Sequence, residues 1–290
     1  MSNIGPDFIC IGAQKAGTGW LYEQLRAHPD FWVPPIKELH YFDRLARSDD
    51  PNAGRSLPSA RTDEERIMIG RDRARNPIDD DFLSRFENLS ERQSLDLDAY
   101  GRLFSIKQDR IAGDITPGYS TLDDAMIEKI VTGFPATKII FMARDPVERA
   151  WSQLSMYVRR GLIRRFDSAD VEQISSHLRR PEIVSRSFPS RIVGRWRRHV
   201  AADLFRVFFF DDLTIDAAGL RQSIITFLGG DPAKQSGSLP ADYNAKAAKP
   251  KLPMNQSASR LVAEFFKTEL RACATELGGP AAHWPDRYGF

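Results

Sequence analysis

Short apolar runs alternate with amphipathic segments along this chain, and the alternation predicts strands and helices in turn. Three apolar runs are typical of buried parallel strands: Phe8–Ile11, Lys138–Ala143 and Phe205–Phe210. Three segments have the pattern of helices: Trp20–Ala27, Leu122–Val131 and Val147–Arg160. Because strands that alternate with helices build a parallel sheet with helices on both faces, we predict an α/β fold with a central parallel sheet.

The length and composition favour one domain. The chain has 290 residues, of which 42% are hydrophobic, and this is enough for one substantial core. We therefore expect a single domain over residues 1–290. Two stretches interrupt the alternation: 44–93 is rich in charged residues, Pro and Gly, and 161–190 is rich in Arg. Both are longer than ordinary connections, which is typical of ligand-binding insertions.

Charge and cysteine content exclude several classes of protein. The formal net charge of +2 is too small for a general binder of polyanions, so we predict no nucleic-acid partner. Cys10 and Cys273 are too few for a disulfide framework and fit a reducing compartment. The chain shows neither an apolar stretch of membrane-span length nor a signal-like N-terminus. These features predict a cytoplasmic protein without a membrane span.

No metal site is predicted from the sequence. The histidines are scattered and the two cysteines lie far apart. The acidic run Asp79–Asp81 lacks the alternating spacing of a calcium loop, so we interpret it as a solvated turn.

Two segments have the pattern of phosphate-binding sites. The phosphate loop, Gly12–Trp20 (GAQKAGTGW), follows the first predicted strand, and the arginine segment, Arg144–Ser152 (RDPVERAWS), follows the strand that ends at Ala143. Each opens a predicted helix, whose first N–H groups suit an anion. Two such sites predict a nucleotide that carries phosphate at two positions.

The phosphate loop differs from a Walker A loop. That motif has the form G-x-x-x-x-G-K-[ST], with lysine directly after the second glycine. Here Thr18 follows Gly17, and Lys15 comes two residues before that glycine. An ATPase is therefore disfavoured. A nucleotide phosphotransferase on a related fold, or a non-catalytic binder of nucleotides or sulfated glycans, stays open as an alternative function.

The two segments together resemble the sulfotransferases that use 3′-phosphoadenosine 5′-phosphosulfate (PAPS). Lys15–Leu21 resembles that family's K-x-G-T-[ST] loop followed by Trp-Leu, except at Gly19, and Arg144–Ser152 matches R-[DN]-P-x-[ED]-R-x-x-S throughout. The resemblance extends from Phe8 to about Leu228. It implies a P-loop-NTPase-like sulfotransferase fold, PAPS as co-substrate, adenosine 3′,5′-bisphosphate as product, and no metal.

The resemblance also implies roles for individual residues. Lys15 would stabilise the charge that develops on the leaving phosphate. Trp20 either packs near the adenine or is a core residue, and both interpretations stay open. The residues expected to bind the nucleotide are Gln14, Lys15, Ala16, Gly17, Thr18, Gly19 and Trp20 in the phosphate loop, Arg144 and Ser152 in the arginine segment, and Lys246 in a later basic stretch.

A third segment, Lys37–Asp43 (KELHYFD), supplies candidates for the general base. It resembles the K-E-x-H-F-F-D segment of the heparan sulfate sulfotransferase branch and its bacterial relatives, which implies that Glu38 is the base. His40 and Asp114 are rival candidates. Ile115 replaces a lysine that the heparan enzymes carry, which disfavours a glycosaminoglycan acceptor. We expect a hydroxyl or amine on a small-molecule or carbohydrate acceptor, bound between the insertions 44–93 and 161–190.

Overall fold

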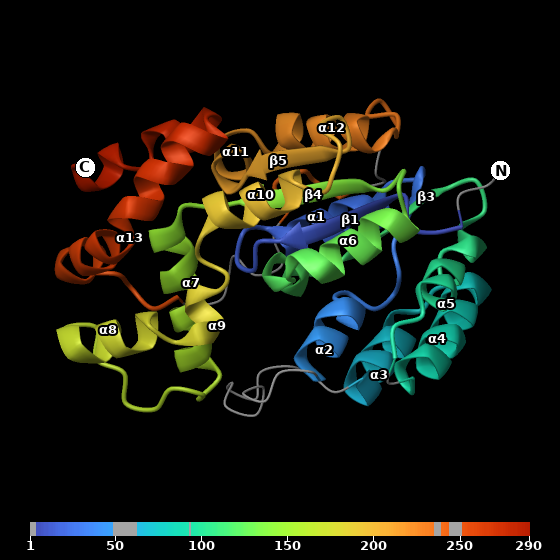
Figure 1. Ribbon diagram of the computed structural model, residues 1–290, viewed down its shortest axis with the longest axis horizontal. Coiled ribbons are helices and arrows are strands. Elements are labelled where there is room, and N and C mark those ends of the chain that lie inside the picture. The colour runs from blue at the N-terminus through green and yellow to red at the C-terminus, as the bar shows by residue number, and fades with distance from the viewer. Residues whose placement is uncertain (1–3, 49–62, 93, 235–238, 244–250) are drawn as a thin grey trace.

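The computed structural model describes residues 4–48, 63–92, 94–234, 239–243 and 251–290. At its centre lies one parallel sheet of five strands in the order β2-β3-β1-β4-β5 (Figure 1). The strands are β1 (Phe8–Gly12), β2 (Phe31–Trp32), β3 (Ile111–Ile115), β4 (Lys138–Ala143) and β5 (Phe205–Phe209). The predicted single α/β domain with a parallel sheet is confirmed.

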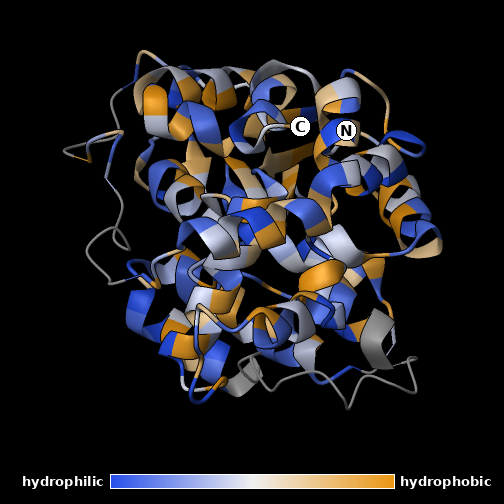
Figure 2. Ribbon diagram, turned by 90° about the vertical axis from the view of Figure 1, so that its left-hand side faces the viewer, coloured by the Kyte–Doolittle hydropathy of each residue, from blue (hydrophilic) through white to orange (hydrophobic). Residues whose placement is uncertain are grey.

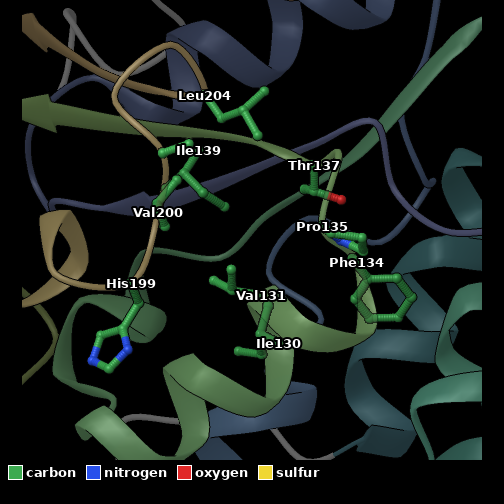
Figure 3. Close-up of a pocket in the computed structure, with 10 residues that line it drawn as sticks. Ile130, Val131, Phe134, Pro135, Thr137, Ile139, His199, Val200 and Leu204 are labelled. Atoms are coloured by element: carbon green, nitrogen blue, oxygen red, sulfur yellow. The ribbon is translucent and has the colours of Figure 1, made fainter.

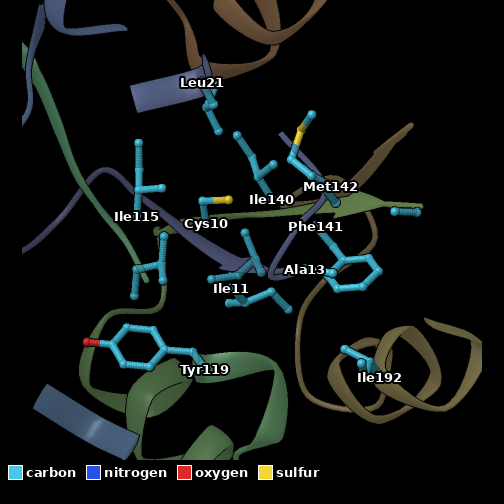
Figure 4. Packing of buried hydrophobic residues seen from close by; sticks show 14 of the residues in the cluster. Cys10, Ile11, Ala13, Leu21, Ile115, Tyr119, Ile140, Phe141, Met142 and Ile192 are labelled. Carbon is cyan, nitrogen blue, oxygen red and sulfur yellow. The ribbon is translucent and has the colours of Figure 1, made fainter. Parts of the chain in front are cut away.

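Helices cover both faces of this sheet. In Figure 4, Cys10 and Ile140 lie on the side of Leu21 from α1 (Thr18–Ala27), whereas Phe141 lies on the side of Ile192 from α10 (Pro189–Arg197). All five side chains are almost fully buried. Successive residues of a strand point to opposite faces, so a strand covered on both faces is apolar throughout.

The remaining helices extend these two layers and the ends of the sheet. Figure 2 shows hydrophobic and hydrophilic residues side by side along the outer helices, as expected for helices that bury one face. They are α2 (Tyr41–Ser48), α3 (Asp63–Arg73), α4 (Pro77–Ser90), α5 (Leu97–Arg102), α6 (Asp124–Gly133), α7 (Pro146–Arg159), α8 (Val171–Leu178), α9 (Pro181–Val184), α11 (Phe210–Ile215), α12 (Ala217–Leu228) and α13 (Gln256–Leu277). Short 3-10 turns are η2 (Ser105–Lys107), η3 (Pro117–Thr121), η4 (Gly279–His283) and η5 (Asp286–Tyr288).

The strand order places the two predicted phosphate segments next to each other. After β3, the chain crosses from one side of β1 to the other, and β4 pairs directly with β1. Ligands of open α/β sheets bind at such a switch point, outside the carboxyl ends of the strands. The phosphate loop follows the carboxyl end of β1, and the arginine segment follows the carboxyl end of β4. The two segments therefore lie next to each other at this end of the sheet.

The element boundaries differ from the prediction by one or two residues. Helix α1 begins at Thr18 rather than Trp20. Helix α6 begins at Asp124 rather than Leu122, because Asp123 caps it by accepting a hydrogen bond from the N–H of Met126. Strand β5 ends at Phe209, because the next residue already opens α11. The strand predicted over Lys138–Ala143 is confirmed with the same bounds.

The described part of the insertion 44–93 is mostly helical, and α4 joins the core through Phe82, Leu83 and Phe86. The interpretation of Asp79–Asp81 as a solvated turn is wrong. These residues lie in α4, with Asp79 and Asp80 in its first turn, and Asp79 is buried with a carboxylate oxygen 3.0 Å from Nε1 of Trp32. Carboxylates are favoured at a helix N-terminus because they interact with the helix dipole.

The insertion 161–190 contains α8 and α9. In the part of the chain that the structure describes, no helix has the length and apolar character needed to cross a bilayer. The same residues contain no group of three His, Cys, Asp or Glu side chains that could hold a metal ion.

Candidate active site

The phosphate loop turns from β1 into α1 through backbone conformations that favour glycine. Gly17 caps the helix with φ +90°, and a Cβ atom there would lie 3.0 Å from Cδ2 of Leu213. The cap makes no side-chain hydrogen bond, and the first turn of α1 contains no acidic residue. The first N–H groups of α1, which include those of Thr18 and Gly19, therefore have no partner within the helix and suit an anion.

Lys15 and its neighbours join the loop to other elements. Lys15 has φ +74°, and its carbonyl oxygen accepts a hydrogen bond from Nη1 of Arg144 over 2.7 Å. Gln14 accepts a hydrogen bond on Oε1 from Arg186 Nη1 over 3.1 Å, while Ala16 is buried. The fold thus brings the phosphate loop and the arginine segment into direct contact.

Arg144 makes two further contacts. Its guanidinium carbon lies 4.2 Å above the ring of Phe210, and Nη2 lies 3.2 Å from Oε2 of Glu148. Its Nε is buried and has no hydrogen-bond partner among the described residues. Burial lowers the pKa of Arg144, although Glu148 partly offsets this effect. Ser152 lies partly buried in the second turn of α7.

The C-terminal residues hold the start of α7, which the sequence analysis did not anticipate. Asp145 caps α7 by accepting a hydrogen bond from the N–H of Val147 over 2.9 Å. Its other carboxylate oxygen accepts a hydrogen bond from the hydroxyl of Tyr288 over 2.9 Å and lies 3.5 Å from Nη1 of Arg287. Burial raises the pKa of Asp145 to about 6. The residue that follows Arg144 is therefore fixed by a segment more than 140 positions away in sequence.

Two tryptophans hold the residues that flank a basic stretch. Trp20 is buried, and its Nε1 donates to the carbonyl oxygen of Ala241. Trp151 of α7 donates from Nε1 to the carbonyl oxygen of Leu252 over 3.0 Å. Trp20 is therefore a buried residue with one polar contact, and its packing near the adenine stays a prediction. Lys246 lies outside the described residues.

Glu38 follows β2 in a left-handed conformation, with φ +70°. Its side chain is 34% exposed, with Oε1 2.5 Å from Nζ of Lys37 and Oε2 3.4 Å from Nε2 of His40. Burial opposes ionisation of Glu38, but the charge of Lys37 and the hydrogen bond from His40 together hold its pKa well below the usual value. Glu38 is therefore a carboxylate at neutral pH.

His40 lies between two carboxylates. Its Nδ1 lies 2.9 Å from Oδ2 of Asp43, and its Nε2 faces Glu38. Burial opposes protonation, but the hydrogen bonds to Asp43 and Glu38 outweigh it and raise the pKa of His40 to about 9. Gly118 permits this packing, because a Cβ atom there would lie 2.4 Å from Oδ2 of Asp43. Asp43 was not singled out from the sequence, although it stands three residues after His40 at the start of a helix.

Asp114 is fully enclosed. Oδ1 accepts from the hydroxyl of Thr116 over 2.7 Å, and Oδ2 accepts from the hydroxyls of Tyr119 and Tyr100 over 2.7 and 3.0 Å. Burial raises its pKa, against the effect of these hydrogen bonds. The hydroxyl of Tyr119 also accepts a hydrogen bond from the backbone N–H of Tyr41. Asp114 thus supports the residue next to His40 rather than facing an open space.

An apolar pocket lies at the opposite edge of the sheet (Figure 3). Thr137 and Leu204, which line it, directly precede β4 and β5. The phosphate loop and the arginine segment lie beyond the carboxyl ends of the strands. This pocket is therefore separate from the candidate active site.

A comparison with models of protein families assigns the chain. The model described as "Sulfotransferase family" matches residues 6–232, which include the phosphate loop, the Lys37–Asp43 segment and the arginine segment. The chain belongs to the sulfotransferase family. A search of curated protein sequences finds no significant match.

Solved structures share the fold. A sulfotransferase from Alicyclobacillus acidocaldarius is similar over 96% of this chain and 98% of its own, with a TM-score of 0.66 and 20% identity. The sulfotransferase domain of the Synechococcus PCC 7002 olefin synthase is similar over 91% of this chain and 96% of its own, with a TM-score of 0.53 and 17% identity. The sulfotransferase domain from the curacin biosynthetic pathway is similar over 91% of this chain and 98% of its own, with a TM-score of 0.51 and 14% identity.

Proposed function

We propose that the protein transfers a sulfuryl group from PAPS to a hydroxyl or amine of a small-molecule or carbohydrate acceptor. The observation that carries the proposal is the contact between the two predicted phosphate segments, in which Arg144 donates to the carbonyl oxygen of Lys15. The two segments are 129 positions apart in sequence and meet at the edge of the sheet where α/β proteins bind ligands.

The residues at this edge fit a nucleotide with two phosphate positions. The first N–H groups of α1 and the hydroxyl of Thr18 suit the 5′-phosphate. Arg144 has a buried Nε without a partner among the described residues, and Ser152 lies in the second turn of α7, the helix that begins just after Arg144. An arginine that retains an unmatched donor suits the 3′-phosphate, because charged hydrogen bonds to phosphate satisfy it. Lys246 remains a proposed further contact.

PAPS supplies an activated sulfuryl group when it is bound. The bond between sulfur and the phosphate oxygen breaks with its electron pair on the phosphate, and the acceptor oxygen or nitrogen forms the new bond to sulfur. The positive charge of the Lys15 ammonium stabilises the negative charge that grows on the departing phosphate. Since that charge is greatest late in the reaction, Lys15 stabilises the transition state more than the bound substrate.

Glu38 is the proposed general base. It is ionised and one third exposed, so it can accept the proton that leaves the acceptor. His40 is protonated below about pH 9 and therefore cannot accept that proton at neutral pH. We assign His40 the role of holding the Glu38 carboxylate, with Asp43 behind it. Asp114 supports the same segment through Tyr119 and Tyr41.

An acceptor screen tests this function. The purified protein is incubated with ³⁵S-labelled PAPS and panels of sugars, phenols, alcohols and amines, without magnesium, and products are read by mass spectrometry for one added sulfuryl group. Lys15→Ala and Glu38→Gln serve as controls. A parallel incubation contains ATP and magnesium, and magnesium-dependent turnover of ATP without sulfate transfer would instead support a phosphotransferase. Binding of PAPS without transfer to any acceptor would support a non-catalytic binder.

A further inference from the structure

A second arginine of the arginine segment is buried against neutral groups. Arg149 of α7 is 0% exposed. Its Nε and Nη2 donate to the hydroxyl of Ser187 over 3.1 and 2.6 Å, and its Nη1 donates to Oε1 of Gln153 over 2.8 Å. Nη1 also lies 3.5 Å from the carbonyl oxygen of Gln14 in the phosphate loop. The guanidinium thus has hydrogen-bond partners that carry no charge.

Arg186 reaches the phosphate loop from the insertion 161–190. It lies in the short connection between α9 and α10, next to Ser187, and donates from Nη1 to Oε1 of Gln14. Its Nε is buried and has no hydrogen-bond partner in the described part of the chain. Since Oε1 of Gln14 is the acceptor in this contact, the amide nitrogen of Gln14 is a further donor beside the two arginines.

Positive charges outnumber negative ones around Arg149 and Arg186. Burial, followed by the positive charge of Arg186, lowers the pKa of Arg149 to about 9, and Arg144 acts in the same direction. Within the residues that the structure describes, neither Arg149 nor Arg186 lies within 4.0 Å of a carboxylate, whereas Arg144 pairs with Glu148. A buried cation without a counterion is costly, and an anion that binds here would offset that cost.

We propose that Gln14 and Arg186 form an oxyanion subsite beside the phosphate loop, separate from the positions of the two nucleotide phosphates, and that Arg149 positions it. The proposal rests on the proposed function. Arg149 acts through Ser187, which adjoins Arg186, and through the backbone of Gln14. The ligand is a sulfate-like or carboxylate group. It belongs either to the sulfuryl group of the donor or to an acidic acceptor, and the experiment separates these two sources.

The first measurement uses inorganic sulfate as the probe. Sulfate is titrated by calorimetry into protein saturated with adenosine 3′,5′-bisphosphate, which fills both phosphate positions and has no sulfuryl group. Arg186→Gln should weaken sulfate binding at least tenfold. Arg191→Gln is the matched control, because Arg191 is an exposed arginine five residues later on α10, and it should leave sulfate binding unchanged. Circular dichroism confirms folding, and Arg186→Lys replaces the glutamine variant if that variant does not fold.

The second measurement identifies the source of the anion. If Arg186→Gln also reduces the preference for PAPS over adenosine 3′,5′-bisphosphate, the subsite binds the sulfuryl group of the donor. If that preference is kept while sulfate binding is lost, the subsite binds an acidic group of the acceptor. Unchanged sulfate binding together with an unchanged PAPS preference would overturn the subsite. Failure of wild-type protein to bind either nucleotide would overturn the proposed function instead, and titration of sulfate without nucleotide would still test the subsite.

Discussion

Nη1 of Arg144 lies 2.7 Å from the carbonyl oxygen of Lys15, so the first residue after β4 donates directly to the loop that follows β1. The same guanidinium stacks on Phe210 and approaches Glu148. One arginine therefore fixes the relative positions of the two segments to which we assign the phosphates. Removal of this side chain should weaken nucleotide binding more than it lowers the stability of the fold.

Arg144→Ala should weaken nucleotide binding mainly through the 3′-phosphate. The expected loss is roughly 2 kcal/mol, because the contact to phosphate is a charged hydrogen bond. Calorimetry with PAPS and adenosine 5′-phosphosulfate measures it, and the variant should bind the two nucleotides with similar affinity. A preference for PAPS equal to that of the wild-type protein would show that another group contacts the 3′-phosphate.

Lys15→Ala should reduce turnover far more than it reduces affinity for adenosine 3′,5′-bisphosphate. The reason is that the ammonium interacts most strongly with the charge that develops on the departing phosphate. Turnover is measured with an acceptor from the screen, and affinity is measured by calorimetry. Arg191→Ala provides a control for the loss of one positive charge. Equal losses in turnover and affinity would show that Lys15 binds the nucleotide without stabilising the transition state specifically.

Glu38→Gln should leave PAPS binding nearly normal and lower turnover by about a hundredfold or more, the usual effect of removing a general base. The substitution keeps the size of the side chain while it removes the basic oxygen. His40→Asn, in contrast, should retain part of the activity, because His40 holds Glu38 and does not accept the proton. An active Glu38→Gln together with an inactive, folded His40→Asn would move the base to His40.

His40 should also make stability depend on pH. Its pKa rises from 6.5 to about 9 on folding, so its stabilising effect is complete below about pH 6.5 and is lost as the pH rises through about 9. The difference corresponds to about 3 kcal/mol at most. Urea unfolding between pH 6 and 10 should show this decline, and His40→Asn should flatten it. His283→Asn is the control, because that side chain is 79% exposed. An equal decline in wild type and His40→Asn would contradict this assignment.

Tyr288→Phe tests the contact between the C-terminus and α7. It removes the hydroxyl that donates to Asp145 and leaves a buried carboxylate oxygen with a weaker set of partners. Unfolding in urea should show a loss of about 1–2 kcal/mol. Tyr243→Phe changes a tyrosine that is 43% exposed and should have little effect. If both variants are equally stable, the C-terminal turn does not hold the start of α7.

Local patterns were sufficient to predict the strands β1 and β4, the loops after them and the helices that follow. Apolar runs report burial, and Gly17 and Asp145 stand where a turn or a helix start requires them. Apolar runs, turn glycines and helix caps each depend only on residues that are close in sequence. The sequence alone therefore determined the class of fold. The buried helix α4 was less predictable, because its apolar residues are separated by charged ones.

The tertiary structure alone decided which distant groups meet. Tyr288 reaches Asp145, Arg186 reaches Gln14, and Asp114 is closed in by hydroxyl groups from Tyr100 and its own loop. These contacts join segments between 14 and 172 positions apart, and their geometry follows from how the helices pack on the sheet. The charge state of a buried group depends on all of its neighbours at once, so His40 could be ranked against Glu38 only when Asp43 and Lys37 were placed around them.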